Sequence, residues 1–391
     1  MTQPERYIPY GRQTISEEDI QAVVETLRSD WLTQGPAVER FERVVSDYCG
    51  AQYGVAVNSA TSALHIACLA AGLGAGDTLW TSPNTFVASA NCALYCGAKV
   101  DFVDIDPRTY NMSIDALREK LVKAEQAGCL PKVVIPVHFA GQSCEMEQIG
   151  ELAGKYGFTV IEDASHAIGG EYQGVKVGSC RYSQMTAFSF HPVKIVTTGE
   201  GGMVATNSKN LMEKLLRLRS HGITRDPALM DRASHGGWYY QQIELGFNYR
   251  MTDIQAALGV SQMARVDEFV ASRNRIAQRY NKELAGLPLI LPWQAPDAAS
   301  ALHLYPVCID PNRTHLTRKS IFEALRDAGI GVNVHYIPVH TQPYYRNLGF
   351  IEGMFPESER YYAAALSLPI FHGLDEASQD YVINQLKVAF T

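Results

Sequence analysis

Residues 158–166 read FTVIEDASH, an apolar run that ends in two carboxylates and a histidine. Phe158–Glu162 is short and rich in β-branched and aromatic residues, and it predicts a buried strand. Asp163 then stands at the carboxyl end of that strand, where open α/β sheets bind their ligands. A carboxylate there needs a partner, for which a protonated ring nitrogen is well suited. A simple helix N-cap is an equally good interpretation of these residues alone.

Short strands and helices alternate on both sides of this segment. The further predicted strands are Tyr53–Val57, Thr78–Thr81, Val100–Asp104 and Val133–Val137. The predicted helices between them are Thr61–Ala71, Ala88–Tyr95, Ile114–Ala127 and Glu145–Tyr156. Alternation at this spacing predicts an α/β fold with a mostly parallel sheet that is covered by helices.

The pattern changes after a long polar helix, which we predict over about residues 253–284. Pro288, Pro292 and Pro296 then interrupt the chain, and a smaller α+β segment follows. A length of 391 residues also favours more than one domain. We therefore expect a large domain over residues 1–265 and a small C-terminal domain over residues 266–391.

Charge and composition narrow the range of partners. The formal net charge is −7, so the chain lacks the basic footprint of a nucleic-acid binder. Met1–Arg6 contain no apolar signal core, and no run approaches the roughly 18 apolar residues that cross a bilayer. None of the eight cysteines forms a CxxC pair, which favours free thiols in a reducing compartment. We expect a cytoplasmic protein with no metal and with no nucleic-acid or membrane partner.

A turn rich in hydroxyl residues, Asn58–Leu64, follows the first predicted strand of this region. Ser59 is suited to the N-cap position of the next helix. Thr61 and Ser62 would then offer amides and hydroxyls at the positive end of that helix, which is a natural seat for a phosphate. Ordinary capping explains the same residues and is the more common reason for such a turn.

Lys194 follows the apolar residues Phe188, Phe190 and Val193. Burial lowers the pKa of a lysine and makes the neutral amine available for Schiff-base chemistry. Glycines at positions 199, 201 and 202 allow the backbone to turn sharply or to approach a ligand. A surface lysine whose stem packs on the turn is the alternative, and the flanking aromatic residues weigh against it.

The three segments occur in the order typical of fold-type I pyridoxal-phosphate (PLP) enzymes, with Lys194 31 residues after Asp163. Over about residues 7–385 the chain resembles the StrS-type (DegT-like) nucleotide-sugar aminotransferases. The motifs that carry this resemblance are WLTQGP at 31–36, the turn at 58–64, EDASH at 162–166, residues 188–194 with GEGG at 199–202, GFNYR at 246–250, and Val334-His335-Tyr336 with Pro338, His340, Pro343 and Tyr344.

The resemblance implies a fold-type I aminotransferase fold and a PLP site. Lys194 would form the Schiff base and move the proton, and Asp163 would pair with the pyridine nitrogen. Phe86 would stack on one side of the cofactor, and His166 would lie against the other. The residues that would hold the phosphate are Thr61, Ser62 and Ser189.

The same resemblance implies a homodimer with shared active sites, in which a neighbouring subunit supplies Asn248 and Arg250. Contacts to the substrate would come from His335, His340 and Arg250. Leu32–Gly35 and His191–Gly202 are most similar to the branch of pseudaminic-acid biosynthesis. That branch implies amino transfer, with L-glutamate as donor, to C4 of a UDP-linked 4-keto-6-deoxy N-acetylhexosamine.

Several alternatives stay open. One is a C3 or C4 aminotransferase that acts on a dTDP-linked keto sugar. A PLP-dependent sugar dehydratase would carry His where Lys194 stands, and a non-catalytic regulator would need a reading surface that this acidic chain lacks. The sequence does not favour an α/β-hydrolase, a P-loop nucleotidase or a zinc metalloprotease, because the motifs GxSxG, GxxxxGK[ST] and HExxH are absent. The candidates for binding the donor carboxylates are Arg219, Arg225 and Arg250.

Overall fold

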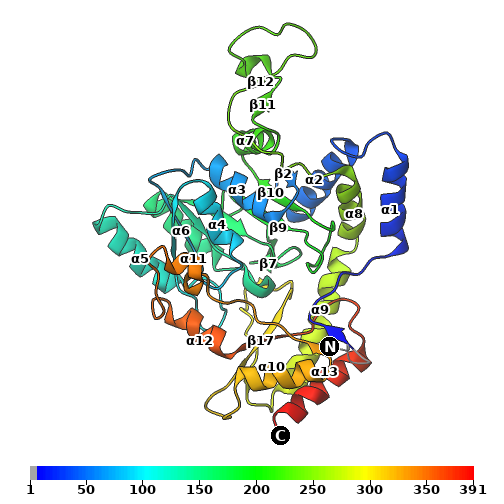
Figure 1. Ribbon diagram of the computed structural model, residues 1–391, viewed down its shortest axis with the longest axis vertical. Coiled ribbons are helices and arrows are strands. Elements are labelled where there is room, and N and C mark those ends of the chain that lie inside the picture. Colours follow the sequence, from blue (N-terminus) through cyan, green and yellow to red (C-terminus); the bar gives the residue numbers. More distant parts are fainter. Residues whose placement is uncertain (1–6) are drawn as a thin grey trace.

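The computed structural model describes residues 7–391, so the prediction of no signal segment at Met1–Arg6 lies outside the described residues. A seven-stranded sheet forms the centre of the larger part of the molecule (Figure 1). Strand β10 runs antiparallel to both its neighbours, and the other four pairings are parallel. In spatial order the strands are β2 (Tyr53–Val57), β10 (Gly202–Thr206), β9 (Met185–Ser189), β6 (Thr159–Asp163), β5 (Val133–Ile135), β3 (Thr78–Thr81) and β4 (Lys99–Phe102). The predicted α/β class with a mostly parallel sheet is confirmed.

Helices cover both faces of this sheet, which explains why its strands read as continuous apolar runs. Successive side chains of a strand point to opposite faces. In β6, Ile161 joins one core cluster and its neighbour Val160 joins another. The first cluster includes residues of α3 (Ala60–Ala70), α4 (Ala88–Tyr95) and α7 (Lys209–Arg219). The clusters on the other face include residues of α2 (Pro36–Cys49), α5 (Ile114–Gln126), α6 (Met146–Tyr156) and α8 (Asp253–Met263).

The predicted long helix over residues 253–284 is wrong as one element. It consists of α8 and a separate helix α9 (Val266–Leu284). The amides of Ala264 and Arg265 bond back three residues, to the carbonyls of Ser261 and Gln262, which closes the end of α8. The two helices then pack on different neighbours: α8 lies against α2 and α1 (Glu17–Arg28), whereas α9 lies against α13 (Glu376–Ala389).

The C-terminal part is built on a smaller antiparallel sheet of β13 (Leu289–Ile290), β15 (Tyr305–Ile309) and β17 (Ala365–Leu368). Its core also holds residues of α9, α13 and α10 (Arg318–Asp327). The N-terminal strand β1 (Ile8–Pro9) pairs in parallel with β16 (Ile330–Gly331), so the start of the described chain packs on this part. The domain boundary near residue 265 stays a prediction.

The remaining elements lie at the periphery. Strands β11 (Ile223–Thr224) and β12 (Gln241–Gln242) form an arm that projects from one end of the molecule, at the top of Figure 1.

No helix within residues 7–391 combines the length and the apolar character that crossing a membrane requires. The other elements are β7 (Glu171–Tyr172), β8 (Val175–Lys176) and β14 (Ala298–Ala299), the 3₁₀ turns Phe139–Gly141, Pro227–Leu229 and Val339–Thr341, and helices α11 (Pro343–Arg346) and α12 (Pro356–Ala364).

Candidate active site

A cavity of about 530 Å³ lies at the carboxyl ends of the central strands. The turns that follow β2, β3, β5, β6 and β9 all reach it, as expected for a ligand site in an open α/β sheet. The segment 333–336 of the C-terminal part closes another side. Of the residues predicted from the sequence, the cavity is lined by Lys194, Asp163, His166, Thr61, Phe86, Ser189 and His335.

Lys194 is half-buried and lines this cavity. Burial lowers the pKa of its amine to about 8, although the Asp163 carboxylate acts in the opposite direction. Within residues 7–391 the amine makes no hydrogen bond or ion pair. Phe188 and Phe190 are fully buried next to it in sequence, so it is not a lysine of the open surface. The arrangement offers a reactive, partly neutral amine.

Asp163 is 5% exposed at the end of β6. Its Oδ2 accepts a hydrogen bond from Ser89 Oγ at 2.6 Å, and its Oδ1 accepts from Ser165 Oγ at 2.6 Å. The chain after Asp163 forms turns, and no helix begins within the next residues. The helix N-cap interpretation of this carboxylate is therefore wrong.

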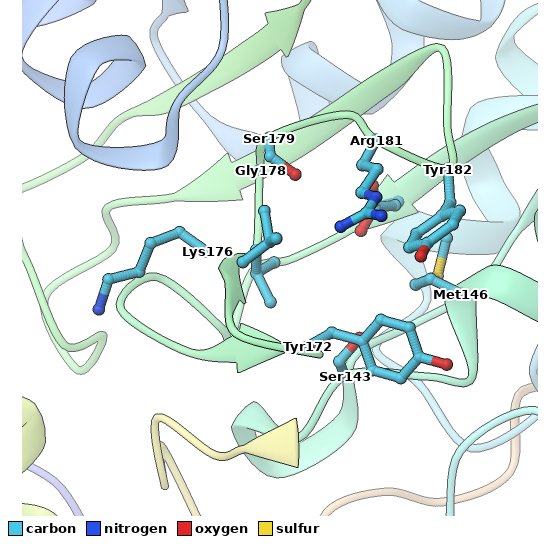
Figure 2. Close-up of a pocket in the computed structure, with 11 residues that line it drawn as sticks. Ser143, Met146, Tyr172, Lys176, Gly178, Ser179, Arg181 and Tyr182 are labelled. Atoms are coloured by element: carbon cyan, nitrogen blue, oxygen red, sulfur yellow. The ribbon is translucent and has the colours of Figure 1, made fainter. Parts of the chain in front are cut away.

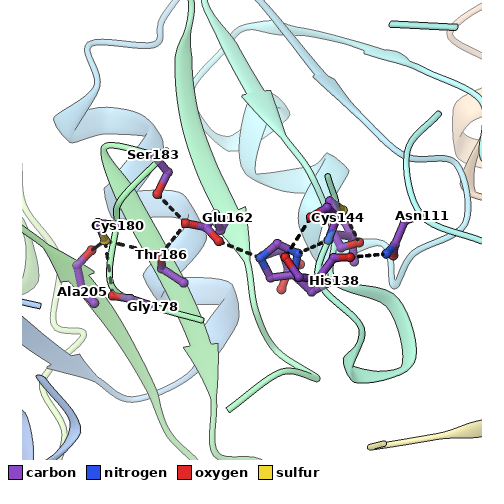
Figure 3. A network of polar contacts seen from close by, with 12 residues as sticks. Asn111, His138, Cys144, Glu162, Gly178, Cys180, Ser183, Thr186 and Ala205 are labelled. Atoms are coloured by element: carbon purple, nitrogen blue, oxygen red, sulfur yellow. Dashed lines mark hydrogen bonds and ion pairs between the residues drawn. The ribbon is translucent and has the colours of Figure 1, made fainter. Parts of the chain in front are cut away.

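A buried polar network fixes the strand behind Asp163 (Figure 3). The neighbouring carboxylate Glu162 points to the opposite side of the strand, where His138 Nε2 lies 2.7 Å from it and Thr186 Oγ1 donates at 3.0 Å. Burial opposes ionisation of Glu162, but the hydrogen bonds from His138, Ser183 and Thr186 outweigh it and lower its pKa. The His138 amide also donates to the Asp163 carbonyl at 3.0 Å, so the network holds the backbone that carries Asp163.

His166 lies at the wall of the cavity and is buried. The Ala140 amide donates to its Nδ1 at 3.3 Å, and the hydroxyl of Tyr336 lies 3.1 Å from its Nε2. Burial lowers the pKa of His166 well below its ordinary value, and Lys194 and His335 act in the same direction. His166 therefore stays neutral at the pH of a living cell.

The hydroxyl-rich turn after β2 faces the cavity through Ser59, Ala60 and Thr61. Ser59 is the N-cap of α3 and accepts from the Ser62 amide at 3.1 Å. Ser62 does not line the cavity, because its hydroxyl donates to Asn58 Oδ1 at 2.6 Å and contacts Ser59 Oγ. Of the residues predicted to hold the phosphate, Thr61 and Ser189 therefore line the cavity and Ser62 does not. Ser59 lines the cavity as well.

Gly202 explains how this turn comes so close to the sheet. A Cβ atom on Gly202 would lie 2.4 Å from the carbonyl carbon of Ser59 and 2.6 Å from the amide of Ala60. Any side chain larger than hydrogen would push β10 and the turn apart. Gly202 is therefore required for the contact between β10 and this turn, and its predicted approach to a ligand stays a prediction.

The two histidines of the C-terminal motif lie in different environments. His335 lines the cavity, and burial together with Lys194 lowers its pKa to about 3. His340 is 0% exposed and packs among aromatic rings, with its Nε2 2.8 Å from Glu359 Oε1. The structure does not bring His340 to the cavity, because the 3₁₀ turn Val339–Thr341 directs it into the core.

Asn248 and Arg250 do not line the cavity of their own chain. Asn248 is exposed and Arg250 is half-buried. Among the candidate arginines for the donor carboxylates, Arg219 is occupied by Glu42 Oε1 and by the Ala56 carbonyl, and Arg225 lies on the exposed arm. None of the three arginines reaches this cavity within one chain.

Several cavity residues lacked a signal in the sequence. Ser89, which orients Asp163, lies in the first turn of α4 and resembles any buried helix serine. Tyr10 and Asn333 come from opposite ends of the chain, and only the fold brings them together. Tyr336 belongs to a recognised motif that gave it no individual role.

A second, much smaller pocket of about 20 Å³ is lined by Glu162 and by residues of β7 and β8 (Figure 2). It holds no more than a water molecule. Figure 2 shows the Lys176 side chain extending away from the other labelled side chains, and its Nζ pairs with Glu171. Within residues 7–391, no three His, Cys, Asp or Glu side chains are grouped in a way that could hold a metal ion.

The donor set of the large cavity fits an aromatic phosphate with an aldehyde. The start of α3 and the hydroxyls of Ser59, Thr61 and Ser189 suit a phosphate. The unpaired Lys194 amine suits a carbonyl carbon, and the Asp163 carboxylate suits a protonated ring nitrogen. Phe86, at 59% exposure, offers an aromatic face at the same cavity.

The sequence is similar to those of known aminotransferases. The sequence profile of the DegT/DnrJ/EryC1/StrS aminotransferase family matches residues 13–387. The spore coat polysaccharide biosynthesis protein SpsC of Bacillus subtilis is 40% identical over 385 residues, which cover 97% of this chain and 96% of that protein. The UDP-4-amino-4,6-dideoxy-N-acetyl-beta-L-altrosamine transaminase of Campylobacter jejuni is 38% identical over 381 residues, which cover 97% and 96%.

The fold comparison agrees with the sequence comparison. The structure of Helicobacter pylori PseC, described as an aminotransferase involved in the biosynthesis of pseudoaminic acid, matches with a TM-score of 0.89 at 31% identity. The match covers 98% of this chain and 99% of that one. Spr1654 of Streptococcus pneumoniae, described as a "putative sugar aminotransferase", has been solved in a PMP form and in a PLP form, which match with a TM-score of 0.87 at 30% and 28% identity. The chain therefore belongs to the DegT/DnrJ/EryC1/StrS aminotransferase family and is a PLP-dependent sugar aminotransferase.

Proposed function

We propose that this enzyme moves an amino group from L-glutamate to C4 of a UDP-linked 4-keto-6-deoxy N-acetylhexosamine. The cavity that presents the unpaired Lys194 amine opposite Asp163 carries the amino-transfer part of this proposal. The sugar is supported by the Campylobacter jejuni relative, whose name describes a UDP-sugar with its amine at C4 and no oxygen at C6. A cavity of about 530 Å³ also has room for a sugar ring beside the cofactor.

When bound, PLP supplies a carbonyl carbon that reacts with amines and a ring that accepts electrons. We assign to Lys194 the covalent attachment and the movement of the proton, since a pKa of about 8 leaves part of the amine neutral near neutral pH. Asp163, oriented by Ser89 and Ser165, keeps the ring nitrogen protonated. His166 is the third residue of this catalytic group.

We assign the rest of the cofactor site to the turns around it. Thr61, Ser189 and the amides at the start of α3 receive the phosphate, with Ser59 beside them. Ser62 supports this turn through its bonds to Ser59 and Asn58. Phe86 stacks on the side of the cofactor opposite His166, and on the substrate side His335 is the residue that reaches the cavity.

We further propose a homodimer whose two active sites each use residues of both subunits. The arm and the segment that follows it expose large apolar side chains, with Trp238 76% and Leu245 77% exposed. Large apolar side chains exposed on one projecting segment are typical of an interaction surface. Asn248 and Arg250 follow this segment in sequence and do not line their own cavity, and we assign both to the cavity of the neighbouring subunit. There Asn248 contacts the cofactor, and Arg250 contacts the cofactor and the diphosphate.

The same proposal includes two statements about the whole chain. We propose a large domain over residues 1–265 and a small one over residues 266–391, supported by the separate C-terminal core, with β1 lying against the small domain. We also propose a cytoplasmic enzyme, because all eight cysteines are free in the structure.

A single-turnover comparison tests the substrate. The enzyme preloaded with pyridoxamine phosphate is mixed with the UDP-linked 4-keto sugar, or with 4-keto or 3-keto dTDP-sugars, and the amino sugar is detected by mass. The UDP-linked sugar should discharge the enzyme fastest, and Lys194→Ala protein should produce no amino sugar from any of them. Faster discharge by a dTDP-sugar would reject the proposed substrate and leave the family assignment intact. The comparison with dTDP-sugars is necessary because the name of the B. subtilis relative, which is 40% identical, specifies no nucleotide.

A further inference from the structure

A directed chain of hydrogen bonds ends at the hydroxyl of Tyr336. The Ala140 amide donates to His166 Nδ1 at 3.3 Å, so Nδ1 carries no proton. A neutral imidazole has a single N–H, which must then be on Nε2. Because Nε2 lies 3.1 Å from the Tyr336 oxygen, His166 donates and Tyr336 accepts.

The direction of this chain does not reverse near neutral pH. Burial lowers the pKa of His166 well below its ordinary value, and Lys194 and His335 add to this effect. Protonation would also place a second N–H against the Ala140 amide. His166 thus remains a neutral donor toward Tyr336.

Tyr336 consequently needs a separate acceptor for its own hydrogen. No side chain or carbonyl of residues 7–391 accepts a hydrogen bond from this hydroxyl, and Tyr336 lines the cavity. Burial and the nearby Asp163 carboxylate raise the pKa of Tyr336, so the hydroxyl keeps its proton. The cavity wall therefore presents one oriented O–H donor without a protein acceptor.

We propose that Tyr336 is a further cofactor-contacting residue, whose hydroxyl donates a hydrogen bond to the anionic ring oxygen of bound PLP. Two contacts place it on the cofactor side of the cavity. Its ring lies nearly parallel to that of His166, at 19° and 6.1 Å, and its centroid is 6.3 Å from that of Phe86. The inference rests on the proposed positions of His166 and Phe86 against the cofactor, and it does not depend on which sugar is used.

The test compares the absorbance of holoenzymes as a function of pH before any substrate is added. A donor to an anionic oxygen favours the deprotonated cofactor, so Tyr336→Phe should raise the apparent pKa of the bound cofactor by about one unit. The matched control is Tyr361→Phe, whose hydroxyl donates at 2.9 Å to the His335 carbonyl but does not line the cavity. That variant should leave the cofactor pKa unchanged. Both variants keep the other titratable groups that line the cavity, namely Tyr10, Asp163, His166, His191, Lys194, Glu200 and His335.

A second pair of variants tests the role of His166 as the residue that orients Tyr336. His166→Gln keeps an amide donor and a carbonyl acceptor and should shift the cofactor pKa less than His166→Ala does. An unchanged pKa in Tyr336→Phe holoenzyme would overturn the proposal, as would an equal shift in Tyr361→Phe. A Tyr336→Phe enzyme that differs only in the KM for the sugar would assign the hydroxyl to the substrate instead. Because the titration contains no sugar, a wrong substrate assignment leaves this result unaffected.

Discussion

Asp163 and Asp104 show that one kind of side chain serves two purposes in this protein. Asp104 accepts hydrogen bonds from the amides of Glu357 and Ser358, at 2.9 and 3.0 Å, and so caps the start of α12. Asp163 lies where no helix begins and directs its charge toward the cavity. The first task needs an acceptor oxygen, whereas the second needs the negative charge itself.

Exchanging each aspartate for asparagine separates these tasks. Asp163→Asn should lower kcat between roughly 10- and 150-fold, which is the kinetic equivalent of one charged hydrogen bond. Asp104→Asn should leave kcat unchanged, because Asp104 does not line the cavity and its oxygens accept only from backbone amides. Both variants should unfold in urea within about 1 kcal/mol of the wild type. Equal kcat values for the two variants would return Asp163 to a structural role.

The pKa of Lys194 predicts how fast PLP binds covalently at different pH. Only the neutral amine reacts, so the rate should rise about tenfold per pH unit below pH 8 and level off above it. Stopped-flow absorbance of the apoprotein with PLP measures this rate, and borohydride followed by peptide mass analysis identifies the lysine.

Two variants control this experiment. Lys176→Ala removes a lysine that is paired with Glu171 outside the cavity, and it should leave the profile unchanged. Lys194→Ala should form no reducible adduct. A rate that still rises steeply at pH 10 would mean that Lys194 has the ordinary lysine pKa of 10.5.

The cavity residues that the sequence could predict share one property: each lies at the end of a strand, in the turn that follows a strand, or within a short motif. Asp163, Thr61 and Ser189 are of this kind. Ser89 is not, because it lies 74 residues before the carboxylate that it orients and has no local pattern around it. His340 shows the opposite case, since it shares a motif with His335 but turns toward Glu359 in the core.

At the level of elements, the contact between β10 and the turn after β2 sets the shape of the phosphate end of the cavity. The two backbones meet at Gly202 without room for a Cβ atom. Displacing them would move the amides of Ala60 and Thr61 relative to Ser189, which lies opposite Gly202 in the sheet.

Gly202→Ala should therefore weaken PLP binding as well as the fold. The backbone atoms that the new methyl group meets cannot rotate away, so we expect a loss of about 1–3 kcal/mol of unfolding free energy. The Kd of PLP should rise at least roughly tenfold, since the phosphate amides shift. Gly74→Ala is the matched control, because a Cβ there meets nothing within 4 Å. An unchanged Kd in Gly202→Ala protein would contradict this role.

Elements with a clear apolar period were predicted closely, and those without one were not. The bounds of β2, β3 and α4 agree with the prediction to the residue. The end of α8 was missed because Ala264 and Arg265 are ordinary helix formers, and only the change of packing partner ends the helix there. The reversed direction of β10 also has no sequence signal, because direction depends on the connection and not on the strand itself.

At the scale of the whole molecule, mixed dimers test whether active sites are shared. Lys194→Ala protein and Asn248→Ala/Arg250→Ala protein should each be inactive alone. If subunits exchange freely at equal amounts, half the dimers are hybrids with one intact site, which gives about a quarter of wild-type activity. The activity recovered after mixing therefore measures whether the two subunits share their active sites.

The control mixture places both defects in the same site. Lys194→Ala and Asp163→Asn each damage the cavity of their own subunit, so their hybrids hold no intact site and should show no activity beyond the residual activity of the Asp163→Asn protein. Fluorescently labelled subunits confirm that exchange has occurred. No recovery in the first mixture despite proven exchange would count against shared sites.

The pairing of β1 with β16 has a consequence for how the polypeptide is made. Ile8 leaves the ribosome about 320 residues before its partner Ile330. At typical rates of synthesis the first strand waits roughly 15–60 s for that partner. The central sheet can assemble during this interval, since all seven of its strands lie before residue 207. The C-terminal part can complete itself only after β16 and β17 have emerged, so it should become resistant to proteases later than the central sheet.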